Sequence, residues 1–206
     1  MPTRRLLLLS GAALAATAAF PALAQRANPM PDELRRALER DPNVPVLGNP
    51  QGDVTLTEFF DYNCPFCRKM VPVMQQLIAS DPNLRVVFRE WPVFGEGSEF
   101  AARAALASLG QGKYWQMHAG LMGMKGRAEE ATVMRTARQV GLDPDRLRAD
   151  MQKKHVSDHI QGSMDLADHM GLAGTPSLIA GDEAVFGQIS LGELQAMVAR
   201  ARRALG

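Results

Sequence analysis

The sequence predicts an α/β domain whose sheet is interrupted at its middle by a block of helices. Three observations predict this fold class. Strand-like apolar runs flank a helix between residues 44 and 91, and no convincing strand follows between residues 98 and 171. Two short apolar runs and a helix then return after residue 173. The expected order is therefore β-α-β, a helical block, and β-β-α.

The composition is that of an ordinary globular protein. The chain has 206 residues, of which 46% are hydrophobic, and its formal net charge is +1. This length suits one domain that carries an insertion. The balanced charge gives no argument for nucleic acid or for acidic partners.

The first residues have the pattern of an export signal. Arg4 and Arg5 give a positive start, and an apolar run extends from Leu6 to Phe20. Ala22-Leu23-Ala24 supplies the small residues that a signal peptidase needs. Because the apolar run is short for a membrane span, we expect residues 1–24 to be a signal peptide that is cleaved after Ala24. The sequence leaves open whether the general or the twin-arginine route exports it.

The elements before the cysteines follow from apolar spacing and turn residues. Residues 25–43 are expected to form an N-terminal helical segment, with a short helix over Pro31–Arg40. A short strand is expected near Val44–Leu47 and a longer strand over Val54–Phe60. Alternation along the longer strand places Glu58 on the same face as three apolar side chains, those of Val54, Leu56 and Phe60.

A long helix and a strand complete the first half of the α/β domain, residues 44–96. The helix is expected over Cys64–Ser80, with a kink at Pro72, because proline removes one helical hydrogen bond. The strand is expected over Leu84–Trp91.

Residues 97–172 are expected to form an all-helical insertion. Ser98 is expected to cap a helix that runs to Gly110, and Asp143-Pro144 is expected to open another helix. The other helices are expected over Lys113–Gly123, Thr132–Gly141 and His155–Gly171.

The second half of the α/β domain spans residues 173–206. Two short strands, Ser177–Ala180 and Ala184–Phe186, are separated by Gly181-Asp182, which suits a tight hairpin. Ser190 and Glu193 have the spacing of a capping box, which predicts a final amphipathic helix.

The only two cysteines, Cys64 and Cys67, lie at the start of the long helix. A thiol in the first turn of a helix meets unpaired backbone N–H groups and the positive end of the helix dipole, and both stabilise a thiolate. Only the thiolate attacks disulfides or binds soft metals. A bridge across two intervening residues would remove little unfolded-state entropy, so the pair is expected to be reactive rather than structural.

Further motifs accompany the pair in a fixed order. They are Phe59-Phe60-Asp61-Tyr62-Asn63-Cys64-Pro65-Phe66-Cys67, Pro72, and Gly174-Thr175-Pro176. On these residues the chain, from about Val44 to Leu205, resembles the DsbA-family thiol–disulfide oxidoreductases. The resemblance implies a thioredoxin fold with an inserted all-helical domain and a periplasmic location.

The resemblance also implies roles for the site residues. Cys64, expected on the solvent side of the helix start, would be the nucleophile, and Cys67 the resolving thiol. Glu58 resembles the family's buried acid, which exchanges protons with the inner thiol, while a solvated edge position is the alternative. Thr175-Pro176 resembles the cis-proline loop that pairs with substrate peptide. Pro65-Phe66 would set the redox poise and contact substrate, and Phe66 stands where the family often has histidine.

Other charged residues and the histidines are expected to be structural. Glu90 has the strand parity of Glu58 and is expected to pair with Lys69 or an arginine. No second cysteine pair or carboxylate cluster completes a metal site, so neither a metal nor an organic cofactor is expected. Four histidines are expected to be exposed on helices, namely His118, His155, His159 and His169.

The expected function is an exported oxidase that exchanges disulfides with reduced or misbridged exported proteins. A quinone-linked membrane partner of the DsbB type would reoxidise it. The alternatives are a reductase or isomerase recharged by a membrane reductant, and a copper- or zinc-binding module that uses the same thiols. Because residues 25–43 are too short for a separate dimerisation domain, a monomer is expected.

Overall fold

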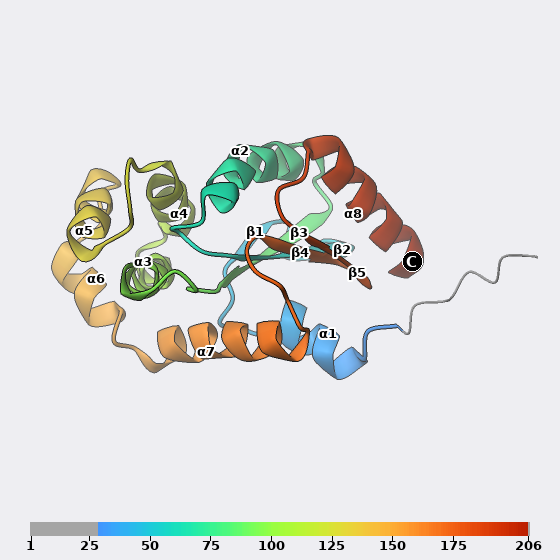
Figure 1. Ribbon diagram of the computed structural model, residues 1–206, viewed down its shortest axis with the longest axis horizontal. Coiled ribbons are helices and arrows are strands. Elements are labelled where there is room, and N and C mark those ends of the chain that lie inside the picture. The colour runs from blue at the N-terminus through green and yellow to red at the C-terminus, as the bar shows by residue number, and fades with distance from the viewer. Residues whose placement is uncertain (1–28, 206) are drawn as a thin grey trace, which may run out of the picture.

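A five-stranded mixed sheet forms the centre of the molecule (Figure 1). The computed structural model describes residues 29–205, and the expected signal peptide at residues 1–24 lies outside this part. The strand order is β1-β3-β2-β4-β5, with β2 and β3 parallel and the other neighbouring pairs antiparallel. The strands are β1 (Val46–Gly48), β2 (Val54–Phe60), β3 (Leu84–Glu90), β4 (Ser177–Ala180) and β5 (Glu183–Phe186).

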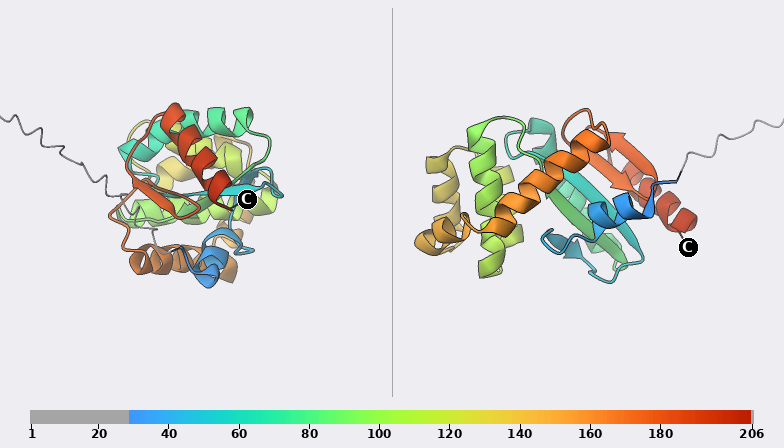
Figure 2. Two further views of the ribbon diagram at one scale, coloured as in Figure 1. Left: turned by 90° about the vertical axis from the view of Figure 1, so that its right-hand side faces the viewer. Right: turned by 90° about the horizontal axis from the view of Figure 1, so that it is seen from below.

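Helices cover both faces of this sheet. In Figures 1 and 2, α2 and α8 lie on one face, α1 and α7 lie on the other, and α3 to α6 gather beyond one end. All the described elements between β3 and β4 are helical, as the sequence predicts. The α-helices are α1 (Asp32–Glu39), α2 (Pro65–Ser80), α3 (Glu96–Ala107), α4 (Tyr114–Gly123), α5 (Glu130–Gln139), α6 (Pro144–Asp150), α7 (Lys154–His169) and α8 (Leu191–Leu205), and a 3₁₀ turn, η1 (Ser108–Gln111), follows α3.

Most predicted elements are confirmed to within two or three residues, and one cap is wrong. Helix α3 begins after Gly95, whose φ of 93° suits glycine, so Ser98 is not its cap. Ser98 lies inside the helix instead, and its hydroxyl donates to the Asp61 carboxylate at 2.7 Å. Helix α2 continues through Pro72.

The sheet separates two apolar clusters. Alternate residues of β2, including Leu56 and Phe60, belong to a large cluster that also contains apolar residues of α2 and α8. Phe59 belongs to a smaller cluster with Leu38 of α1 and Ala167 of α7. Because both faces are covered, every residue of β2 and β3 is buried.

A buried arginine of β3 fixes the C-terminal end of α1. The Arg89 side chain is 0% exposed, and it donates to the carbonyls of Ala37 and Leu38 and pairs with Asp41 at 3.2 Å. The last carbonyls of a helix have no partner within the helix, so Arg89 satisfies two of those of α1.

We expect Arg89→Met to lower the free energy of unfolding by about 3–5 kcal/mol, because it leaves buried acceptors and Asp41 without their partner. Urea unfolding followed by circular dichroism measures the change. Arg36→Met, on the exposed side of α1, is the matched control and should cost less than about 0.5 kcal/mol. Equal, small effects of the two substitutions would contradict the role given to Arg89.

Candidate active site

The two cysteines lie at the first turn of α2, where the sequence places them. Cys64 is the N-cap residue with extended backbone angles, and Pro65 occupies the first helical position. The backbone N–H of Cys67 donates to the Cys64 sulfur at 3.4 Å. Both cysteines are free thiols, so the structure represents the reduced form.

The expectation that Cys64 faces solvent is wrong, since Cys64 and Cys67 are each only 1% exposed. The Cys64 sulfur lies 3.3 Å from the carbonyl oxygen of Thr175, whose peptide bond to Pro176 is cis. The loop before β4 therefore lies against the sulfur and covers it. By contrast, the neighbouring Phe66 ring is 52% exposed.

Hydrogen bonds to sulfur lower the pKa of Cys64 to about 6. The largest cause is a hydrogen bond from the Cys67 thiol, and burial opposes it; the Thr175 side chain and the N–H groups of Cys67 and Phe66 lower the pKa further. At pH 7, about 90% of Cys64 is then thiolate. Burial raises the pKa of Cys67 far above its ordinary value, and the hydrogen bond to Cys64 adds to this. The reactive charge is thus concentrated on Cys64.

Glu58 is buried in the centre of the sheet, so the solvated edge position is wrong. In the sheet register Glu58 lies opposite Phe88 of β3 on one side and opposite Leu178 of β4 on the other, and it is 3% exposed. Burial, followed by the negative charge of Cys64, raises the pKa of Glu58 to about 8. This carboxyl group is therefore mostly protonated at neutral pH, beneath the cysteine pair.

The predicted partners of Glu90 are wrong. Its carboxylate lies 2.7 Å from His159 Nε2 and accepts the Tyr114 hydroxyl at 2.6 Å. Helices α4 and α7 supply these partners because they pack over the end of β3. The expectation of four exposed histidines is wrong for His159 and for His118, which lies 3.2 Å from the Tyr62 hydroxyl and whose pKa burial lowers to about 3.

Within residues 29–205, no group of three or more histidine, cysteine or carboxylate side chains lies close enough together to hold a metal ion. His155 is exposed and His159 lies against Glu90, so these two histidines do not share a metal site although they are four residues apart on α7. No helix of the described part has the length and apolar character needed to cross a membrane.

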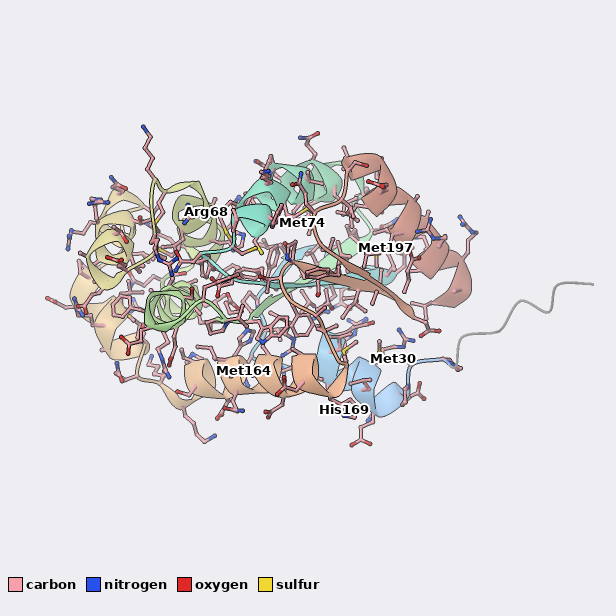
Figure 3. The ribbon with its side chains drawn as sticks, viewed as in Figure 1. Met30, Arg68, Met74, Met164, His169 and Met197 are labelled. Carbon is pink, nitrogen blue, oxygen red and sulfur yellow. The ribbon has the colours of Figure 1, made fainter. Side chains whose placement is uncertain are left out.

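Three residues around the cysteines were given no role from the sequence, and each of them joins separate segments of the chain. Asp61 is buried and its carboxylate accepts four hydrogen bonds. The Asn63 side chain bonds both backbone groups of Ala128 in the α4–α5 loop. Arg68, which lies between α2 and α4 in Figure 3, donates to Tyr62 and to two carbonyls of the same loop. For Asp61 and Asn63 the signal was the polar triplet of residues 61–63 between two apolar runs, whereas Arg68 lies outside this triplet and had no such signal.

We expect Thr175→Val to raise the pKa of Cys64 by about 1 unit, because valine keeps the shape and removes a buried hydroxyl that has no partner in the reduced protein and can donate to the thiolate. The ultraviolet absorbance of the thiolate, followed against pH, measures this. Thr55→Val is the matched control, since it also removes a buried hydroxyl without a partner, but one in the first half of β2 rather than in the loop beside Cys64. An unmoved Cys64 titration in Thr175→Val would mean that the hydroxyl does not reach the sulfur.

Comparison with known proteins is consistent with this geometry. A sequence model of the DSBA-like thioredoxin domain matches residues 55–199. A thioredoxin-like oxidoreductase from Silicibacter pomeroyi has a solved structure that superposes with a TM-score of 0.80 at 54% identity, over 82% of this chain and 98% of that one.

Two curated relatives differ greatly in how much of their length is matched. Disulfide bond formation protein D of Bacillus subtilis is 24% identical over 68% of this chain and 69% of its own length. The Na(+)/H(+) antiporter NhaA 1 of Salinispora arenicola is 30% identical over 76% of this chain and 24% of its own. The chain thus spans about a quarter of the length of the antiporters it matches.

Proposed function

The chain belongs to the family of DSBA-like thioredoxin domains, and we propose that it is a protein thiol–disulfide oxidoreductase acting through Cys64 and Cys67. One observation carries the proposal. A thiol with a pKa of about 6 lies beside a second thiol with a strongly raised pKa, at a helix start and against a cis-proline loop. Such a division of charge suits disulfide exchange, in which one sulfur attacks or leaves as thiolate.

The exchange begins with the oxidised enzyme. A substrate thiolate attacks the Cys64 sulfur, forms a mixed disulfide and breaks the bond to Cys67, which leaves with the electron pair and takes up a proton. A second substrate thiolate then attacks the substrate sulfur of the mixed disulfide and releases the Cys64 thiolate. The substrate loses two electrons and the enzyme gains them. Cys64 is the better leaving group because its pKa is lower.

Glu58 is proposed to exchange the proton of Cys67. Its pKa of about 8 keeps most of it protonated at neutral pH, and the ionised fraction, which grows toward pH 8, is the form that can accept the proton of Cys67. When the reduced enzyme is reoxidised, Cys67 must lose its proton to attack, and the buried Glu58 carboxylate, whose charge acts on Cys67, is the base proposed to accept it.

We expect Glu58→Gln to slow the attack of Cys67 on a Cys64–glutathione mixed disulfide at least about tenfold, and to remove the rise of that rate near pH 8. Stopped-flow fluorescence with oxidised glutathione across a pH series measures both. Glu183→Gln, on the partly exposed strand β5, is the control. An unchanged pH profile in Glu58→Gln would rule out proton exchange by this group.

Polypeptides are the proposed substrates. Four large apolar side chains are exposed around the site, namely Phe66, Val93, Phe94 and Phe186, at 45–60%. Thr175 and Pro176 would pair with an extended substrate backbone, and Pro65 and Phe66 would contact its side chains. Because Cys64 is covered, the contact between its sulfur and the Thr175 carbonyl must open as the substrate enters.

The proposed direction is oxidation of exported proteins. A hydrogen-bonded thiolate stabilises the reduced enzyme, which makes its disulfide oxidising. The export-like pattern of residues 1–24 supports a periplasmic location. We further propose a monomer that is reoxidised by a membrane partner of the DsbB type; a membrane reductant would take that place if the protein were a reductase or isomerase.

Equilibration of the pair with glutathione tests the direction. A reduction potential above about −200 mV supports an oxidase, whereas a value near or below about −270 mV, that of thioredoxin, supports a reductase. The metal-binding alternative is tested on the same reduced protein. Stoichiometric, tight binding of copper or zinc without disulfide exchange would favour that alternative.

A further inference from the structure

Asp61 lies where two connections leave the same edge of the sheet. Because β2 and β3 are parallel, the β2–α2 and β3–α3 connections both run from this edge toward the helical insertion (Figure 1). Asp61 is the first residue after β2 and is 1% exposed. A buried carboxylate is costly unless its oxygens are hydrogen-bonded, so its partners indicate what it holds together.

One carboxylate oxygen of Asp61 holds the connection after β3. Oδ2 accepts the backbone N–H groups of Val93 at 2.7 Å and Phe94 at 3.0 Å. The Phe94 carbonyl is held in addition by the guanidinium of Arg127 at 3.1 Å. We call residues 93–94 the apolar turn, because both side chains are large, apolar and 45–46% exposed. The buried Asp61 side chain thus fixes the backbone of Val93 and Phe94, whose side chains lie outside the apolar core.

The same residue holds the segment that carries the nucleophile. Oδ1 accepts the Asn63 N–H at 2.6 Å and the Ser98 hydroxyl at 2.7 Å, and the Asp61 carbonyl accepts the Cys64 N–H at 3.1 Å. Asp61 therefore fixes the apolar turn and the backbone of Cys64 relative to each other.

We propose that Asp61 is a positioning residue for polypeptide substrates, because it holds the apolar turn at a fixed place beside Cys64. The apolar turn then receives an apolar side chain of the substrate near the reacting cysteine, and Asp61 acts through it. The inference rests on the proposed function. It predicts that Asp61 matters for polypeptides and matters little for small thiols, which do not reach the turn.

A double-mutant cycle tests the proposal in the full mature chain. The variants are Asp61→Asn, Phe94→Ser and the two combined, and the substrates are reduced, unfolded ribonuclease A and dithiothreitol. Asp61→Asn keeps the shape but replaces one acceptor oxygen with a donor. Leu109→Ser is the matched control, since Leu109 is a similarly exposed apolar residue, 40% exposed, in the separate turn η1.

We expect Phe94→Ser and Asp61→Asn each to lower kcat/KM for ribonuclease A about tenfold, with less than about twofold change for dithiothreitol. The combined variant should lose no more than the worse single variant, because one residue acts through the other. Leu109→Ser should change neither rate. The proposal would be overturned if the kcat/KM of the combined variant fell by the product of the two single losses. It would also be overturned if each variant lost as much activity with dithiothreitol as with ribonuclease A.

Two further outcomes are separable. If circular dichroism shows that Asp61→Asn fails to fold, Ser98→Ala is the second variant, because it removes one donor and leaves the carboxylate in place. Ser98→Ala should lower the rate with ribonuclease A about threefold and leave the rate with dithiothreitol unchanged. Equal effects on the two substrates would overturn the inference.

If the unaltered protein oxidises neither substrate, the proposed function itself fails. Activity of the unaltered protein with no selective loss in the variants refutes only the role of Asp61.

Discussion

A Cys67→Ala variant is expected to accumulate stable mixed disulfides between Cys64 and exported proteins, while Cys64→Ser forms none and loses disulfide exchange entirely. The difference follows from the two sulfurs. In the proposed function Cys64 carries the stabilised thiolate that reacts with substrate, and Cys67, with its raised pKa, is needed only to resolve the adduct. Without a resolving thiol the adduct persists.

The measurement is non-reducing electrophoresis of extracts of cells that express the variants, after acid quenching, followed by mass spectrometry of the linked peptides. The variant with both substitutions is the matched control and should show no adducts. Adducts through Cys67 in the Cys64→Ser variant, at a level similar to those of Cys67→Ala, would reverse the assignment of the two thiols.

The reduced protein is expected to gain stability over the oxidised protein as the pH rises from 5 to 8, by about 2–3 kcal/mol. The pKa of Cys64 is lowered to about 6 in the folded reduced form, from its usual value near 9. The stabilisation is therefore fully present only above about pH 9 and is lost as the pH falls through 6. In the oxidised form Cys64 has no thiolate, so this contribution is absent.

Glu58 changes the free energy of unfolding with pH in the direction opposite to Cys64. Its pKa is raised to about 8, so its contribution to the free energy of unfolding is present below its ordinary pKa and is lost as the pH rises through 8. Burial is the main cause of this shift in the reduced form, and because the same burial is expected in the oxidised form, the contribution of Glu58 should largely cancel in the difference between them. Urea unfolding of both forms at pH 5, 6.5 and 8 measures that difference. A constant difference across this range would exclude a stabilised Cys64 thiolate.

Local patterns were enough to predict the elements that position the site. Alternation defined β2, and the turn residues before the cysteines defined the start of α2, because these signals depend on neighbours in the sequence. The parity of Glu58 on β2 likewise predicted its face of the sheet. The capping box at Ser190 and Glu193 is also confirmed.

Features that depend on distant segments could not be predicted in the same way. The burial of Cys64 comes from Thr175, which is 111 residues further along the chain. The partner of Glu90 is His159, on a helix whose packing over β3 no local pattern encodes. Ser98 looked like a cap because its residue type suits one, but its hydroxyl is bound to Asp61.

The most direct measurement is a pH titration of thiolate absorbance in the reduced protein, with Cys64→Ser as the blank. An ionised Cys64 predicts a midpoint near pH 6, and the rate of alkylation by iodoacetamide should rise with the same midpoint. A midpoint above about pH 8, the range of an unperturbed thiol, would contradict the proposal that Cys64 is the activated nucleophile.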